Sequence, residues 1–348
     1  MKKTLLAVGL LGLAASFSFA DISAKLFLSG SLDDSLGNGL LLNNPDQKDN
    51  YPGMVHISAD GKNAGLAFNF YTPGVSDATP VKVQKLSAWF RALPTLKVSV
   101  GGVGLYSYTE QLNWWKAPNG AKFSSAGFDN NIGSDSSPAV AAEFTGVPSL
   151  TLSGIAAPGW GVGLGASQGT NLKVGGSAKY DLKNFGSAAV GLRYDGKGNP
   201  AIAHVGADFN AVPGLYTFVN AVIRNDDTTR FGLDALAIDW YAKYSLKALT
   251  VQAAVPVTLR LTGLSGEVNY LSYDLKVAYD LPAQKLTPFV QAQQDNLNLS
   301  TRKFLPQVNV GTAFTSLDNA SLDLSFQYNV VDGGANTWSI PFNFNIWF

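Results

Sequence analysis

The chain ends in WSIPFNFNIWF (338–348), and this stretch decides the fold. Apolar side chains occupy every second position from Trp338 to Phe348, and Ser339, Asn343 and Asn345 lie between them. An alternation with a period of two is typical of a β-strand with one apolar and one polar face. The glycine-rich segment VDGGAN (331–336) joins this stretch to a second alternating stretch, 321–330, so the two predict a β-hairpin.

The same alternation recurs upstream, at 22–29, 95–100, 171–180 and 249–260. No stretch of comparable length places its apolar residues on the 3.6-residue period of an amphipathic helix. We therefore predict an all-β protein.

Short turns of a repeated form separate the strands. FRALPTL (90–96), FTGVPSL (144–150) and FNAVPGL (209–215) each carry a phenylalanine, then a proline and a leucine at fixed spacing. Proline suits a turn because its φ is fixed and no ladder hydrogen bond is needed there. Looser versions lie at 180–186, 244–249, 279–286 and 314–322, and a simpler turn lies at 59–65. These turns predict nine hairpins and about 18 strands, with 16 as the alternative if the short strands 54–60 and 64–71 do not both span.

The connections at the opposite ends of the strands are longer and more polar. Short turns on one side and longer loops on the other are typical of an antiparallel outer-membrane β-barrel, with short periplasmic turns and longer extracellular loops. Both termini then lie on the periplasmic side. The aromatic residue before each short turn is expected in a girdle at the membrane interface.

The first twenty residues predict a signal peptide. Lys2 and Lys3 precede an apolar run that is too short to span a membrane, and Ser18-Phe19-Ala20 forms a cleavage site. Residues 21–348 are then a single exported barrel domain. Only 14% of the residues are charged, which argues against a soluble enzyme. Cysteine is absent, which excludes thiol chemistry and disulfides. A net charge of zero argues against a nucleic-acid partner.

The alternation alone does not say which face points outward. In a soluble barrel the apolar face would point inward, whereas in a membrane barrel it contacts lipid and the polar face lines the lumen. A sheet of 16–18 strands encloses a lumen too wide for side chains to fill, and the polar face carries few bulky residues. Closure would also satisfy every backbone group within lipid. We therefore predict a lipid-facing apolar side.

With its signal peptide, its amphipathic strands and an aromatic C-terminal strand, the chain resembles a Gram-negative outer-membrane β-barrel protein of the porin type. The resemblance covers the whole mature chain and indicates no subfamily. It implies an outer-membrane location in a diderm bacterium, contact with outer-membrane lipid and, as in many porins, a homo-oligomer. It also implies that the last strand is read by the barrel-assembly machinery, through Phe342, Phe344, Ile346 and Phe348.

The polar face of the predicted strands supplies the residues expected to line the lumen. The basic candidates are Lys25, Lys97, Lys173, Lys179, Arg193, Arg224, Lys243, Arg260, Lys276 and Lys303. The acidic candidates are Asp208, Asp239, Asp274, Asp295 and Asp323. Excess positive charge would favour anions, although wall charges that pair with one another would remove the preference.

The longest connection, 108–137, is the candidate for a loop that folds into the lumen and narrows it, as in porins; an outward loop is the alternative. Its candidate residues are Glu110, Trp114, Trp115, Lys116, Lys122, Asp129 and Asp135.

Motifs for catalysis are weak. GASQG (165–169) matches G-x-S-x-G, but no helix follows it as a nucleophile elbow requires. His56 and His204 are isolated and define no metal site. The sequence therefore predicts a passive pore for small hydrophilic solutes, without cofactor or enzymatic activity and with weak anion selectivity. A barrel-anchored surface adhesin that binds through its loops is the alternative, and a barrel hydrolase is a more distant one.

Overall fold

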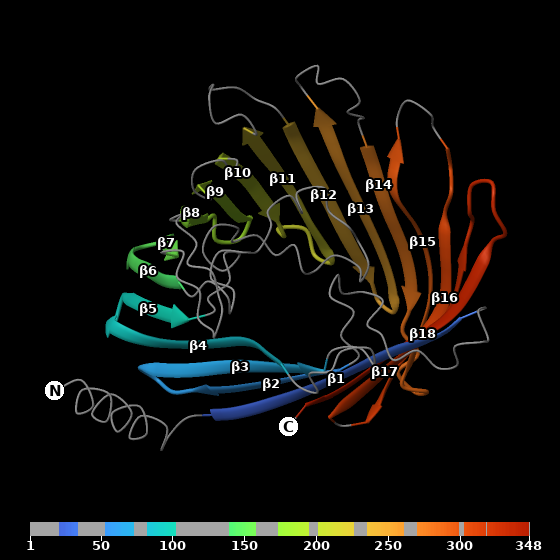
Figure 1. Cartoon of the computed structure of the whole chain (residues 1–348), viewed down its shortest axis with the longest axis horizontal. Coiled ribbons are helices and arrows are strands. Elements are labelled where there is room, and N and C mark those ends of the chain that lie inside the picture. The colour runs from blue at the N-terminus through green and yellow to red at the C-terminus, as the bar shows by residue number, and fades with distance from the viewer. Residues whose placement is uncertain are drawn as a thin grey trace.

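The described residues form a closed ring of antiparallel β-strands, a β-barrel (Figure 1). A computed structural model describes residues 21–33, 53–72, 82–101, 139–157, 173–194, 201–225, 235–260, 270–298, 303–317 and 319–347. Every regular element in these ranges is a strand, so the prediction of an all-β protein is confirmed. No helix in these ranges is long and apolar enough to cross a membrane. The predicted signal peptide, residues 1–20, lies outside them.

Eighteen strands make up the barrel, and they differ in length around it. The strands from β5 to β10 have six to nine residues, whereas those from β11 to β18 have 10 to 13. We call these two regions the short wall and the long wall. The strands are β1 (Asp21–Asp33), β2 (Gly53–Asp60), β3 (Ala64–Thr72), β4 (Lys82–Leu93), β5 (Leu96–Gly101), β6 (Ala139–Val147), β7 (Leu150–Ala157), β8 (Lys173–Asp181), β9 (Gly186–Tyr194), β10 (Ala201–Phe209), β11 (Leu215–Asn225), β12 (Ala235–Leu246), β13 (Leu249–Arg260), β14 (Tyr270–Tyr279), β15 (Leu286–Asn298), β16 (Gln307–Leu317), β17 (Ala320–Asn329) and β18 (Thr337–Trp347).

Each strand pairs with the strands before and after it in the sequence, and all pairs are antiparallel. The ring closes because β1 also pairs with β18, with Leu26 opposite Ile346 and Leu28 opposite Phe344. Closure leaves no strand edge without a partner. Both short strands β2 and β3 belong to the ring, so the count is 18 and the alternative of 16 is wrong.

The apolar face of the sheet points outward. Leu192 on the short wall is 68% exposed and Val290 on the long wall is 52% exposed, although both lie within strands that are paired on both sides. Polar residues of the opposite parity, such as Ser177 and Asn309, are buried instead. The alternative of a soluble barrel with an apolar interior is therefore wrong, since the outward band suits lipid.

All eight predicted short turns join the strands that the sequence indicated. In the turn after β6, Val147 faces Leu150, so Pro148 and Ser149 form a two-residue connection. Proline sets the first turn residue, and the second has a φ of 63°, a left-handed conformation that normally favours glycine. The aromatic residues that precede six of the short turns are all exposed on the outer face, as a girdle requires. They are Phe90, Phe144, Tyr180, Phe209, Tyr244 and Tyr279.

Candidate functional site

The inner face of the barrel is the candidate functional site. Its polar residues come from alternate positions of every strand, and the register places residues of distant sequence segments side by side. Lys243 on β12 faces Gln252 on β13, which faces Lys276 on β14. Lys276 in turn faces Gln291 on β15, and its ammonium lies 4.0 Å from the centroid of the Phe289 ring.

The predicted lumen-lining residues fall into three groups. Lys97, Lys179, Lys243, Lys276, Asp208, Asp239, Asp274 and Asp323 lie on strands with described side chains, on the inward parity. For Lys25, Lys173, Arg193, Arg224, Arg260 and Asp295 only the strand backbone is described. Lys303 differs from both groups, because it lies in the connection between β15 and β16 rather than on a strand.

Three of the predicted acidic residues are shielded from solvent, and Asp208 is 7% exposed. Asp239 is 1% exposed and Asp274 is 2% exposed, both on the long wall. The side-chain nitrogen of Gln291 donates to both carboxylate oxygens of Asp274, at 2.9 and 2.8 Å. Their inward parity is the one that the sequence indicated, and their carboxylates are covered by neighbouring side chains.

A ladder of amide side chains extends this contact across the long wall. Asn309 on β16 donates to Gln291 at 3.4 Å, and Gln307 donates to Asn309 at 3.4 Å. Farther around the ring, Gln327 donates to Asn329, and Asn329 donates to Thr337, both at 3.2 Å. These amide side chains therefore form hydrogen bonds with one another, because strand register aligns their donors and acceptors.

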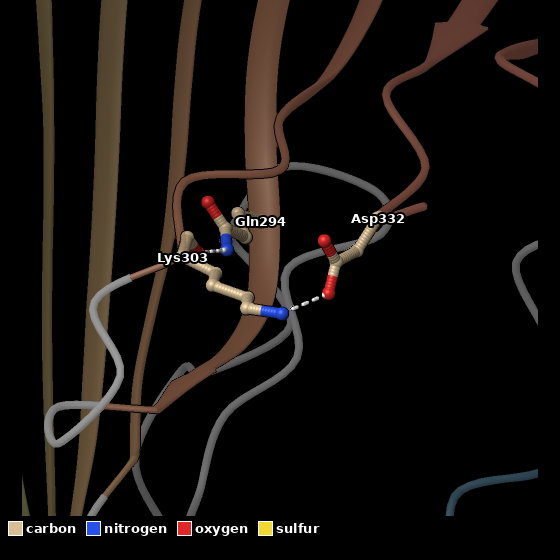
Figure 2. A network of polar contacts seen from close by, with 3 residues as sticks. All are labelled: Gln294, Lys303 and Asp332. Carbon is tan, nitrogen blue, oxygen red and sulfur yellow. Dashed lines mark hydrogen bonds and ion pairs between the residues drawn. The ribbon is translucent and has the colours of Figure 1, made fainter. Parts of the chain in front are cut away.

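Lys303 takes part in a contact between two connections on the long-loop side (Figure 2). Its ammonium forms an ion pair with Asp332, which follows β17. The side-chain nitrogen of Gln294 on β15 donates to the Lys303 carbonyl at 2.9 Å, and the backbone nitrogen of Leu305 donates to the Gln294 side-chain oxygen at 3.0 Å. Phe304 also stacks on Tyr273 of β14, with ring centroids 5.7 Å apart. Lys303 thus ties two loops together.

An aromatic cluster fills the inner side of β11 and β12. The rings of Phe218 and Tyr241 lie 5.4 Å apart, and Tyr216 packs against both. Tyr241 is fully buried, together with Ala254 of β13. The sequence predicted few bulky side chains on the inner face, and this prediction is wrong at the β11–β12 cluster. The aromatic residues were missed because they alternate with polar residues on the same face of their strands.

On the short wall, a lysine and a glutamate face each other without forming an ion pair. The register places Lys97 of β5 directly opposite Glu143 of β6. The Lys97 ammonium lies instead over the ring of Trp89, 4.9 Å from its centroid, and the Trp89 indole donates to Asp60 at 2.9 Å. Gly65 makes room for this indole, since an added Cβ would lie 2.3 Å from its nitrogen. Glu143 was not among the predicted lumen residues.

Glu143 borders a hollow at the short-turn end of β6 to β10, with a volume of about 570 Å³. Its charged lining consists of Glu143, Asp181 and Asp208 together with Lys179 and Lys183. The Oδ1 atom of Asp208 accepts hydrogen bonds from both the backbone nitrogen and the hydroxyl of Ser187. Gly186 allows this approach, because a Cβ there would lie 2.1 Å from the Asp208 carbonyl oxygen.

The predicted constriction residues, from Glu110 to Asp135, lie outside the described residues, so their place stays a prediction. Phe342, Phe344 and Ile346 lie on β18 between β17 and β1, while Phe348 lies outside the described residues. Within the described ranges no group of three or more His, Asp or Glu residues could hold a metal ion. Ser167 of the weak hydrolase motif is also outside them.

Comparison with known proteins finds the fold but no family. No protein-family model and no curated protein matches the chain. Among solved structures, Pseudomonas aeruginosa OccK3 (OpdO) aligns with a TM-score of 0.61 at 11% identity, covering 97% of both chains. Pseudomonas aeruginosa OpdL has a TM-score of 0.59 at 11% identity, covering 95% of this chain and 99% of its own. A mutant of the Rh. blastica porin has a TM-score of 0.52 at 12% identity, covering 95% and 100%.

At these identities the likeness shows the fold alone. It confirms the class-level resemblance to outer-membrane porins that the sequence indicated, with a closed 18-stranded barrel and an outward apolar band.

Two residues that sequence reasoning missed, Glu143 and Trp89, belong to the polar inner face. Glu143 escaped notice because Ala139 and Ala141 precede it on the same parity, so β6 shows little alternation.

Proposed function

We propose that the protein is a porin-type channel of the outer membrane that lets small hydrophilic solutes diffuse through its lumen. The observation that carries this proposal is the closed ring of 18 strands with an apolar outer face and a polar inner face. Antiparallel barrels of about 16–18 strands are wide enough to enclose an aqueous channel. Passage through such a channel needs no catalytic group, so the protein is proposed not to be an enzyme.

Single-channel conductance of the refolded protein in a planar bilayer tests this proposal. A pore gives discrete steps that scale with salt concentration, whereas a barrel that serves as a surface adhesin gives none. The absence of conductance from correctly folded, heat-modifiable protein would contradict the proposal and favour the adhesin.

The channel is proposed to prefer anions weakly. Among the described inward residues, Lys97, Lys179, Lys243 and Lys276 stand against the partly exposed acids Glu143 and Asp323. The buried acids Asp208, Asp239 and Asp274 reduce the preference for anions, because their negative charges also act on ions in the lumen. Reversal potential across a salt gradient measures it. Lys179→Glu together with Lys173→Glu should shift the potential toward cations, and the preference should fade at about 1 M salt, where the Debye length is about 3 Å.

Export, assembly and oligomerisation belong to the same proposal. Residues 1–20 are proposed as a cleaved signal peptide, residues 21–348 as one barrel domain, and the aromatic end of the chain as the signal for the barrel-assembly machinery. Phe344→Ser combined with deletion of Phe348 should lower the amount of barrel in the outer membrane more than it lowers export. Equal amounts of mutant and wild-type barrel would contradict the assembly signal. Analytical ultracentrifugation in detergent checks the proposed homo-oligomer.

A further inference from the structure

We infer that the hollow at the short-turn end of β6 to β10 binds small zwitterions, which carry an ammonium and a carboxylate group on one polar molecule. The inference rests on the proposed function, because it names a solute class for the periplasmic mouth of the channel. Three carboxylates and two lysine ammonium groups line a volume of about 570 Å³. A simple anion would meet the three carboxylates, and a simple cation would meet the two lysines, whereas a zwitterion can satisfy both signs.

The ammonium group of the ligand is placed at Glu143. This carboxylate is partly buried, and it makes no hydrogen bond or ion pair with any residue in the described ranges. Its cross-strand neighbour Lys97 does not neutralise it, because the Lys97 ammonium lies over Trp89 instead. A partly buried carboxylate without a counter-ion is a ready acceptor for a cationic group.

Lys179 and Lys183 supply the opposite sign for the ligand carboxylate. Lys179 lies on β8, two strands from Glu143 on β6, and neighbouring strands are about 5 Å apart, so the two backbones are about 10 Å or more apart. Side chains of this length can reach the two ends of an amino acid or a dipeptide across that gap.

The remaining acids hold the shape of the hollow. The Oδ1 atom of Asp181 accepts a 2.7 Å hydrogen bond from the backbone nitrogen of Lys183, which positions the turn after β8. Asp208 is 7% exposed and is held by Ser187, as described above. These intramolecular contacts hold Asp181 and Asp208 in place around the hollow, which lowers the entropic cost of binding.

Calorimetric titration of glycylglycine into the refolded barrel in detergent tests the inference, since this measurement does not require conduction. Glycinamide serves as the cation-only probe and N-acetylglycine as the anion-only probe. Glycylglycine should bind more tightly than either. Glu143→Gln should weaken its binding about tenfold, the size expected for loss of one charge-assisted hydrogen bond. Asp323→Asn, an acid-to-amide change on the inward face of β17 away from the hollow, is the matched control and should leave binding unchanged.

Lys183→Gln provides a second, exposed variant that tests the carboxylate end and should also weaken glycylglycine binding. The inference is overturned if glycinamide binds as tightly as glycylglycine, if Glu143→Gln leaves the affinity of a folded barrel unchanged, or if Asp323→Asn has the same effect as Glu143→Gln. A barrel that binds glycylglycine but gives no single-channel conductance would overturn the proposed pore and leave the binding site standing. A conducting barrel with no zwitterion binding would do the reverse.

Discussion

Two inward carboxylates, Asp274 on the long wall and Glu143 on the short wall, have opposite surroundings. On the long wall, Asp274 is buried and held by Gln291, and the amide ladder continues the network toward β18. On the short wall, Glu143 faces an open hollow without a partner among the described residues. Figure 1 shows the two walls on different arcs of the ring, with the longer strands β11 to β16 forming one continuous sheet surface.

The comparison shows that inward orientation and exposure to water are separate properties. Both walls follow the same period of two, so both direct polar groups inward. Whether an inward side chain is buried then depends on the side chains that lie opposite it on the two neighbouring strands. Where amides and aromatics align, as around Tyr241 and Asp274, they pack and form hydrogen bonds. On the short wall, the Lys97 ammonium lies over Trp89 instead of pairing with Glu143, so the Glu143 carboxylate is the group proposed to bind a solute.

The largest expected effect concerns packing. Tyr241→Ala on the long wall should destabilise the barrel by about 3–5 kcal/mol, because it removes a fully buried ring. Tyr180→Ala on the short wall should cost less, because that ring lies on the outer face, where the membrane interface rather than packed protein surrounds it. Urea unfolding of both variants in phospholipid vesicles makes the comparison. Equal losses of unfolding free energy would show that the inside of the long wall is not a packed core.

The next effect separates the two faces of one strand. Val251→Arg places a charge on the lipid side of β13 and should cost about 2–4 kcal/mol if the position lies near the bilayer midplane. Gln252→Arg, one residue later, points inward between Lys243 and Lys276 and should cost less, because repulsion between charges in lumen water is screened whereas a charge in lipid is not. The same unfolding measurement applies. If the two arginine variants lose stability equally, the assignment of the outer face fails.

The smallest effect distinguishes a satisfied carboxylate from an unsatisfied one. Gln291→Leu leaves buried Asp274 without the two hydrogen bonds from that side chain and should cost about 1–3 kcal/mol. Glu143→Gln should leave the unfolding free energy nearly unchanged, because it breaks no contact within the described residues. A clear loss of stability in Glu143→Gln would indicate that this carboxylate has a structural partner, and it would remove the contrast between Glu143 and Asp274.

The sequence by itself determined the strands, their faces and the short turns. The period of two sets which side chains share a face, and proline- and glycine-containing turns end each strand, so both signals are local. From these the 18-stranded antiparallel barrel follows, including β2 and β3. The terminal strand was the clearest case, since Phe342, Phe344 and Ile346 lie on one parity and face β1 and β17 as expected.

Only the tertiary structure decided which inward groups contact water and which contact one another. Lys97 and Glu143 are 46 positions apart in the sequence, and closure of the β5–β6 pair sets them opposite each other. The same alternation places Asp274 and Lys276 on the inward face, yet one is buried and the other partly exposed. Burial depends on the register and curvature of strands distant in the sequence, which no local pattern encodes. For that reason the wall was predictable from the sequence, but the hollow at its short-turn end was not.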